Sequence, residues 1–248
     1  MSNKVETGTD DLLADLTDGV LTLTMNRPEA RNAMSDAMTG ALAQQLADAE
    51  LNSAVKVIVL TGAGKGFCAG GDVKGMAASG DGTVGDNTID GAIHRQRLNQ
   101  RGTAGALYSI PKPTIAALPG AAAGAGLSLA LACDMRIMAS SAMMTTAFAK
   151  VGFSGDYGGT FFMSQLIGTA KARELYFLSD RVNAEQALDL GLTNWVCEAD
   201  ELAAKANEIA LRLASGPTVA YRYMKENFAR ALSSVDVNDS LDLDATHH

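Results

Sequence analysis

The sequence has few of the residues that mark several common classes of protein. Its three cysteines, in 248 residues, are far apart and form neither a CxxC motif nor a cluster with histidine. This usage argues against a disulfide scaffold and a cysteine-based zinc site and favours a reducing compartment, so we expect a cytoplasmic protein with no metal or other cofactor. The three histidines are His94, His247 and His248, two of which end the chain. A serine hydrolase triad around Ser128 would therefore lack a well-placed base.

Positive charge is also scarce. The chain has 20 Lys and Arg residues against 28 Asp and Glu residues, which gives a formal net charge of -8. Nucleic-acid grooves and anionic membrane surfaces both attract basic residues, so we expect neither partner. Residues 113–133 are uncharged and long enough for a membrane span, but Pro119 and Gly120 interrupt them and Lys112 and Asp134 flank them. A buried strand, a turn and a buried helix are expected instead.

Glutamate is missing from Leu51 to Arg173. Within this region, the stretch VGFSGDYGGT (residues 151–160) holds a single acid, Asp156, among four glycines. Glycines let a backbone turn tightly or let a ligand approach closely. Asp156 is therefore either a catalytic carboxylate or a stabilising charge at the start of a helix near Thr160.

Strand and helix patterns alternate in the first half of the chain, and helices dominate the second half. The predicted strands cover residues 19–27, 55–64, 113–120, 135–140 and 194–198. The predicted helices cover residues 32–51, 126–134, 160–168, 170–178, 183–192, 199–215 and 217–233. This order predicts a layered α/β core with a helical C-terminal part. A glycine-rich surface loop is expected at residues 75–91.

Two clusters of small residues each follow a predicted buried strand. They are GFCAGGDVKGM, residues 66–76, and PGAAAGAGLSLALACD, residues 119–134. If the two converge, backbone N–H groups from both can form an oxyanion hole. A phosphate-binding interpretation of GAGKG at residues 62–66 fails, because Phe67 takes the place of a third glycine and Gly66 that of a serine or threonine.

The chain resembles the crotonase (enoyl-CoA hydratase/isomerase) superfamily in four stretches with the same order and spacing: NRPEARNAMS, GAGKGFCAGGDVKGM, PKPTIAALPGAAAGAGLSLALACDMRI and GDYGGTFFMSQLIGTAKARELYFLSDRVNAEQALDLGLTNWV. The similarity runs from about Gly19 to Ser233. It implies an α/β spiral of ββα units over residues 1–195 and a helical trimerisation region over residues 196–248, without the family's final helix. It also implies an acyl-CoA substrate and self-association into trimers or hexamers.

The resemblance also assigns site residues. The amides of an oxyanion hole would be those of Gly71, in the AGxD motif, and Ala125. Coenzyme A would lie along backbone that includes Arg31, Ala69, Gly71, Asp72, Val73 and Lys74. The acyl pocket would include Met76, Ser128, Phe148 and Tyr157.

One departure from the family pattern decides the expected reaction. Family hydratases use two glutamates, and Ser128 and Phe148 take their places here. Hydration needs a base for water and an acid for carbon, whereas moving a double bond needs one base between C2 and C4. Family isomerases often carry an aspartate where this chain has Asp156, and an apolar pocket beside Phe148 would raise its pKa. We therefore expect an enoyl-CoA isomerase with Asp156 as base; the alternatives are a hydratase or hydrolase and a non-catalytic acyl-CoA-binding homologue.

Overall fold

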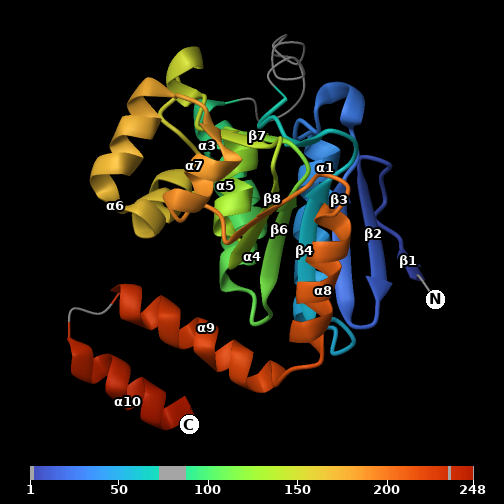
Figure 1. The fold of residues 1–248 in the computed structure, drawn as a ribbon, viewed down its shortest axis with the longest axis vertical. Coiled ribbons are helices and arrows are strands. Elements are labelled where there is room, and N and C mark those ends of the chain that lie inside the picture. Colours follow the sequence, from blue (N-terminus) through green and yellow to red (C-terminus); the bar gives the residue numbers. More distant parts are fainter. Residues whose placement is uncertain (1–2, 73–87, 234–235, 248) are drawn as a thin grey trace.

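The fold is built on two β-sheets of unequal size (Figure 1). The structure is a computed structural model that describes residues 3–72, 88–233 and 236–247. The larger sheet has seven strands in the order β1-β2-β3-β4-β6-β8-β11. Its first three strands are antiparallel, and the strands from β3 to β11 are parallel. The strands are β1 (Asn3–Val5), β2 (Leu12–Thr17), β3 (Val20–Met25), β4 (Val57–Gly62), β6 (Thr114–Leu118), β8 (Met135–Ala139) and β11 (Trp195–Cys197).

The smaller sheet has four short strands in the order β10-β9-β7-β5. They are β5 (Gly66–Cys68), β7 (Ala121–Ala123), β9 (Met143–Thr145) and β10 (Val182–Asn183). β5, β7 and β9 each follow a strand of the larger sheet and precede a helix. The repeated order of two strands and a helix is the predicted spiral of ββα units, so the expected fold class is confirmed.

Helices cover both faces of the larger sheet. They are α1 (Asp36–Leu51), α3 (Ile89–Gln100), α4 (Ala106–Ser109), α5 (Ala125–Ala132), α6 (Gly159–Leu178), α7 (Ala184–Asp189), α8 (Leu202–Ala214), α9 (Thr218–Ser233) and α10 (Val237–His247). Shorter helical turns are η1 (Pro28–Ala30), η2 (Arg101–Gly105) and η3 (Phe148–Val151). Side chains of α1 and α5 belong to the larger core cluster. Those of α8 pack with β4, β6 and β8 in a second cluster.

Local signals explain where several helices begin or bend. The Ser35 hydroxyl accepts a hydrogen bond from the Met38 N–H at the start of α1, and Asn183 forms a capping box at the start of α7. Gly168 has φ 76°, so it breaks α6 where two separate helices were predicted to meet. Every residue of α5 is buried, and no helix in the described part of the chain is long and apolar enough to cross a membrane. The interpretation of residues 113–133 as a buried strand, turn and helix is confirmed.

Some elements were not predicted or were predicted wrongly. The end of the loop expected at 75–91 is helical, because α3 begins at Ile89 after a Thr88 cap; residues 73–87 lie outside the described residues. Strands β1 and β2 and helix α10 were not predicted. Strand β1 is short and mostly polar, the sequence LLADLT of β2 does not alternate regularly, and α10 is interrupted by aspartates. Helices α9 and α10 lie side by side below the spiral (Figure 1).

Candidate active site

The two clusters of small residues meet at the start of α5. Gly70 has φ 98°, and a Cβ added to it would lie 3.0 Å from the Ala123 carbonyl oxygen and 3.4 Å from the Ala125 nitrogen. A Cβ on Gly126 would lie 2.5 Å from the Cys68 carbonyl oxygen. Backbones this close tolerate only glycine, so small residues are required here for packing as well as for ligand approach. The predicted convergence of the two motifs is present.

Both predicted oxyanion amides lie at this junction. Ala125 is the first residue of α5, where an N–H group has no acceptor within its own helix. Gly71 pairs with Met34 in an isolated bridge. Met34 hydrogen-bonds the residues on either side, Gly70 and Asp72, at 2.8 and 3.3 Å. Because peptide groups alternate in direction along an extended segment, the Gly71 N–H points to the side opposite Met34.

The turn that carries Asp156 connects η3 to α6 and is held from two other helices. The Ser128 hydroxyl of α5 donates to the Asp156 carbonyl oxygen at 3.0 Å. The Gln100 side chain of α3 accepts from the Tyr157 N–H at 2.8 Å. Gly155 and Gly158 adopt φ values of 109° and 73°, which only glycine enters readily. The turn therefore needs its glycines for its own conformation.

The Asp156 carboxylate has an unusual environment. Its Oδ1 atom is buried and, alone among buried side-chain nitrogen and oxygen atoms of the described residues, has no hydrogen-bond partner. Burial raises the pKa of Asp156 from 3.8 to about 6. Gly158 is the N-cap of α6 and no side chain caps this end, so the Asp156 carboxylate makes no capping hydrogen bond there. What remains is a partly desolvated carboxylate that can accept a proton.

Three of the predicted acyl-pocket residues are buried around this turn. Phe148, on η3, lies 3.7 Å from the position of a Cβ on Gly124. Ser128 is fully buried, with its hydroxyl engaged to backbone oxygens, so it is no activated nucleophile. Burial, and secondarily the charge of Asp156, raises the pKa of Tyr157 to about 12. The fourth residue, Met76, lies outside the described residues.

The predicted coenzyme A residues that the structure describes lie on one surface. Arg31 and Ala69 are exposed, and the Ala69 N–H donates to the Arg31 carbonyl oxygen at 3.0 Å. Asp72 accepts from the Arg27 guanidinium at 3.0 Å, so its carboxylate has a structural partner. Sequence reasoning missed that role of Arg27. The remaining predicted contacts, Val73 and Lys74, lie outside the described residues.

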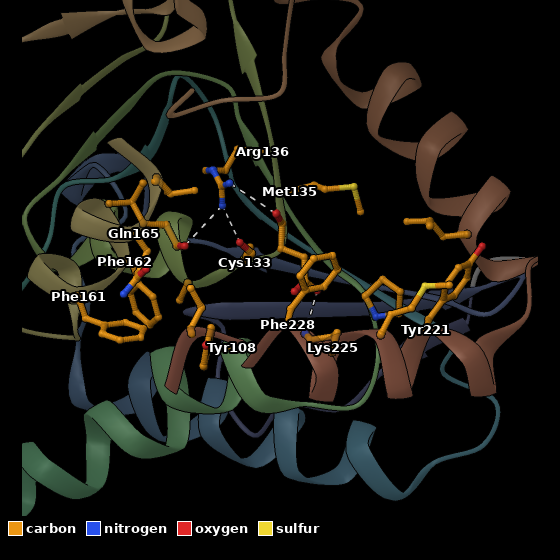
Figure 2. Close-up of a pocket in the computed structure, with 18 residues that line it drawn as sticks. Tyr108, Cys133, Met135, Arg136, Phe161, Phe162, Gln165, Tyr221, Lys225 and Phe228 are labelled. Atoms are coloured by element: carbon orange, nitrogen blue, oxygen red, sulfur yellow. Dashed lines mark hydrogen bonds and ion pairs between the residues drawn. The ribbon is translucent and has the colours of Figure 1, made fainter. Parts of the chain in front are cut away.

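A cavity of about 480 Å³ between α9 and the spiral contains none of the predicted site residues (Figure 2). Its walls are mostly apolar, and the charged side chains that line it already have partners. The Arg136 guanidinium donates to the Cys133 carbonyl oxygen at 2.6 Å, and Lys225 pairs with Asp134 at 2.8 Å. This cavity offers space but no unpaired charged side chain among the residues that line it. The described residues also contain no group of three or more His, Cys, Asp or Glu side chains placed to hold a metal ion.

Sequence reasoning also missed two residues that contact the Asp156 turn. Gln100 was not singled out, because a glutamine at the end of a polar helix carries no distinguishing pattern. Tyr176, on α6, was read only as part of a helix, yet its ring stacks on Phe148 with centroids 5.9 Å apart and planes 17° apart. Its spacing from Asp156 contains no recognisable motif.

Comparison with known proteins identifies the family. The sequence profile described as enoyl-CoA hydratase/isomerase matches residues 15–248. The chain belongs to this family. Members of the enoyl-CoA hydratase/isomerase family are enzymes.

Relatives within the family differ in reaction. The chain is 37% identical to the 1,2-epoxyphenylacetyl-CoA isomerase of Escherichia coli K12 over 227 residues, 92% of this chain and 83% of that protein. It is 34% identical to the short-chain-enoyl-CoA hydratase of Clostridium acetobutylicum over 226 residues, 90% of this chain and 82% of that protein. A crystal structure of an enoyl-CoA hydratase from Polaromonas sp. JS666 has a TM-score of 0.86 at 32% identity, covering 95% and 89% of the two chains. Family membership thus leaves isomerase and hydratase to be distinguished by the site.

Proposed function

We propose that the protein is an enoyl-CoA double-bond isomerase in which Asp156 is the single base. The observation that supports this most directly is the Asp156 Oδ1 atom, which is buried and has no hydrogen-bond partner within the described residues. A buried polar atom without a partner is costly, and such atoms concentrate at functional sites. This oxygen would accept the proton that a substrate C–H group loses.

The proposed reaction moves one proton and one double bond. The Asp156 carboxylate takes a proton from C2 of a 3-enoyl-CoA, and the electron pair of that bond delocalises onto the thioester oxygen. The N–H groups of Gly71 and Ala125 donate to this developing oxyanion. The proton then returns from Asp156 to C4, which yields the conjugated 2-enoyl-CoA. The sum of the steps consumes no second substrate, and we propose no cofactor beyond the coenzyme A of the substrate itself.

The raised pKa of Asp156 suits this role. With a pKa of about 6 the carboxylate is mostly ionised at neutral pH, and it is more basic than an ordinary aspartate. General bases work best when their pKa lies near the working pH, and such a base contributes ~10² to 10⁴ in rate. Among the described residues that face Asp156, the titratable groups are Tyr157 and Tyr176, whose phenols stay protonated at neutral pH.

Hydration is the second candidate, favoured by the similarity to the Clostridium hydratase. It would require a second acid or base to pair with Asp156 around a water molecule. Ser128 and Phe148 offer neither, since one is a hydroxyl bound to backbone oxygens and the other is apolar. For this reason we rank isomerisation ahead of hydration, hydrolysis or acyl-CoA binding without catalysis.

We also propose that coenzyme A lies along the surface that carries Arg31, Ala69 and Asp72, and that the protein self-associates as a trimer or hexamer. Helix α9 has no buried residue, and its exposed apolar side chains include Val219 and Phe228. Such a surface is typical of an interface between subunits. Light scattering at micromolar concentration should give the mass of at least three chains, and the mass of one chain would contradict this proposal.

One experiment separates the two candidate reactions. A 3-enoyl-CoA and crotonyl-CoA are offered to the same preparation in ¹⁸O-labelled water, and the products are followed by mass spectrometry and by the absorbance of the conjugated thioester. The proposal expects fast conversion of the 3-enoyl-CoA without ¹⁸O uptake and little 3-hydroxyacyl product. Fast incorporation of ¹⁸O from water into a 3-hydroxyacyl product of crotonyl-CoA, without double-bond migration, would overturn the isomerase proposal in favour of the hydratase. Binding without turnover of either substrate would favour the non-catalytic alternative.

A further inference from the structure

Tyr176 touches the Asp156 turn from the adjacent helix. A Cβ added to Gly155 would lie 2.9 Å from the Tyr176 ring atom Cε1, and a Cβ on Gly159 would collide with the Tyr176 hydroxyl oxygen. These two glycines flank Asp156 on either side. The ring also stacks on Phe148 at 5.9 Å. Tyr176 is therefore packed against the backbone that sets the position of the Asp156 side chain.

The Tyr176 hydroxyl faces the side chain that anchors the same turn. A Cβ on Gly159 would also collide with the Ser128 hydroxyl oxygen, so the two hydroxyl groups lie on the same side of Gly159. Ser128 in turn donates to the Asp156 carbonyl oxygen at 3.0 Å. The pKa of Tyr176 is raised first by burial and then by the charge of Asp156, which places the phenol within the field of the carboxylate.

The far side of the Tyr176 ring faces open space. Together with Phe153 and Phe177 it lines a cavity of about 400 Å³, and those two side chains are 59% and 74% exposed. Asp156 is not among the residues that line this cavity. The Tyr176 ring thus stands between a solvent-connected cavity on one side and the Asp156 turn on the other.

We propose that Tyr176 is a positioning residue that keeps water from Asp156 and holds its turn in place, so that the site transfers a proton and does not add water. This inference rests on the proposed isomerase function. Water needs polar partners and room to enter a buried site. The aromatic ring removes the room, and its hydroxyl is turned toward Ser128.

The pKa of Asp156 provides a way to measure whether Tyr176 excludes water. Among the described residues, the titratable groups on which the charge of Asp156 acts are Tyr157 on its own turn and Tyr176 on α6. Helix α5 and turn η3 contribute Ser128 and Phe148, which do not titrate. Burial is the cause that raises the pKa of Asp156. Replacing Tyr176 by a small residue should let water reach the carboxylate and return its pKa toward that of an ordinary aspartate.

The test compares Tyr176→Ala and Tyr176→Phe with Phe177→Ala as a matched control. Phe177 lines the same cavity from the next position of α6, so the control opens the cavity without removing the ring packed on Gly155. Three quantities are measured: kcat for isomerisation, ¹⁸O-labelled hydration product from the 2-enoyl-CoA, and the Asp156 pKa by ¹³C NMR. The Asp156 signal is assigned by its loss in Asp156→Asn.

Tyr176→Ala is expected to lower kcat by ~10²-fold, the size of effect of misplacing a reacting group by about 1 Å. It should also raise the share of hydration product and lower the Asp156 pKa from about 6. Tyr176→Phe keeps the ring, so it should retain that pKa and lose no more than ~10-fold in kcat. Phe177→Ala should resemble the unaltered protein in all three quantities.

Two sets of outcomes would overturn the inference while leaving the isomerase intact. One is an unchanged Asp156 pKa and unchanged products in folded Tyr176→Ala. If Tyr176→Ala does not fold, the second overturning outcome is measured on Tyr176→Phe. A fall of the Asp156 pKa to the ordinary value in that variant would show that the ring is not what excludes water. An unaltered protein that hydrates crotonyl-CoA and moves no double bond would instead overturn the proposed function, on which the inference depends.

Discussion

Two aspartates near opposite ends of α5 have opposite surroundings. Asp134, just after the C-terminal end, accepts hydrogen bonds through Oδ2 from the Thr114 N–H at 2.8 Å, the Thr114 hydroxyl at 3.0 Å and Lys225 at 2.8 Å. Asp156, anchored to the N-terminal half of α5 through Ser128, has a buried Oδ1 without a partner. The comparison teaches that a carboxylate with its hydrogen bonds satisfied serves the fold, while a buried one without them is available for chemistry.

The two ends of α5 itself differ in the same way. Carbonyl groups at the C-terminal end meet the Arg136 guanidinium, which is 3% exposed and donates to the Cys133 oxygen at 2.6 Å (Figure 2). Burial lowers the pKa of Arg136. At the N-terminal end the Ala125 amide has no intrahelical acceptor. The protein thus neutralises the negative end of the helix and leaves the positive end facing the candidate site.

The largest effect should come from replacing Asp156 by asparagine, and the same change at Asp134 is its control. Asp156→Asn keeps the shape but cannot accept a proton, so kcat for isomerisation should fall by ~10² to 10⁴ while acyl-CoA binding survives. Asp134→Asn should leave the kcat of the folded protein nearly unchanged. Steady-state kinetics and calorimetric binding of an acyl-CoA check both variants. An Asp156→Asn enzyme with most of its kcat would remove the distinction between the two acids.

The next effect concerns the positive end of α5. Proline lacks an N–H group, so Gly71→Pro and Ala125→Pro should each lower kcat by ~10² to 10³, the usual cost of losing an oxyanion donor. Gly71→Ala and Ala125→Gly keep the amide and should be much milder. Circular dichroism first establishes that each variant is folded. Equal damage from alanine and proline at position 71 would point to packing and away from an oxyanion hole.

A smaller effect is expected from pH. Asp156 must be ionised to act as a base, and its pKa is raised to about 6 by burial. The value of kcat/KM should therefore fall as the pH drops below about 6, by about tenfold for each further unit. The Asp134→Asn variant should show the same profile, because Asp134 takes no part in the reaction. A flat profile between pH 7 and pH 5 would exclude Asp156 as the base.

The smallest effects are on stability, and they should have opposite signs. Asp134→Asn weakens charged hydrogen bonds and should lower the free energy of unfolding by about 1 to 3 kcal/mol. Asp156→Asn should raise it at pH 7, because folding disfavours the ionised form of a carboxylate whose pKa is raised. That gain is fully present above the folded pKa of about 6 and fades as the pH falls to the unfolded value near 4, below which Asp156 is protonated in both states. Urea unfolding at pH 7 and pH 4 measures both changes; a loss of stability in Asp156→Asn at pH 7 would contradict this reasoning.

Much of the candidate site could be predicted because its residues belong to short, continuous motifs. Gly71 and Ala125 each lie in a cluster of small residues that follows a buried strand, and Asp156 is conspicuous as a lone acid among glycines. Small clusters after parallel strands meet at one edge of a sheet, so their convergence follows from the strand order alone. The catalytic roles of these three residues stay predictions.

Other contacts depend on packing between distant segments. Gln100 ends a helix whose sequence is polar on most sides, yet it binds the Tyr157 N–H across the site. Arg27 was expected only as the end of a strand, yet it pairs with Asp72. Neither pairing has a sequence signature, because hydrogen bonds between long polar side chains and remote groups depend on where the backbones lie.

The sequence by itself determined the α/β class and the family. Alternating buried strands and helices leave few ways to cover both faces of a parallel sheet, and the small-residue motifs have a fixed order. Only the tertiary structure decided which carboxylate is satisfied and which is left without a partner. Asp134 and Asp156 are alike as residue types, and they differ because Lys225 of α9 reaches one while the Phe148 and Tyr176 rings enclose the turn that carries the other. Burial and hydrogen bonding depend on those distant neighbours, so the pKa of a carboxylate is a property of the folded chain.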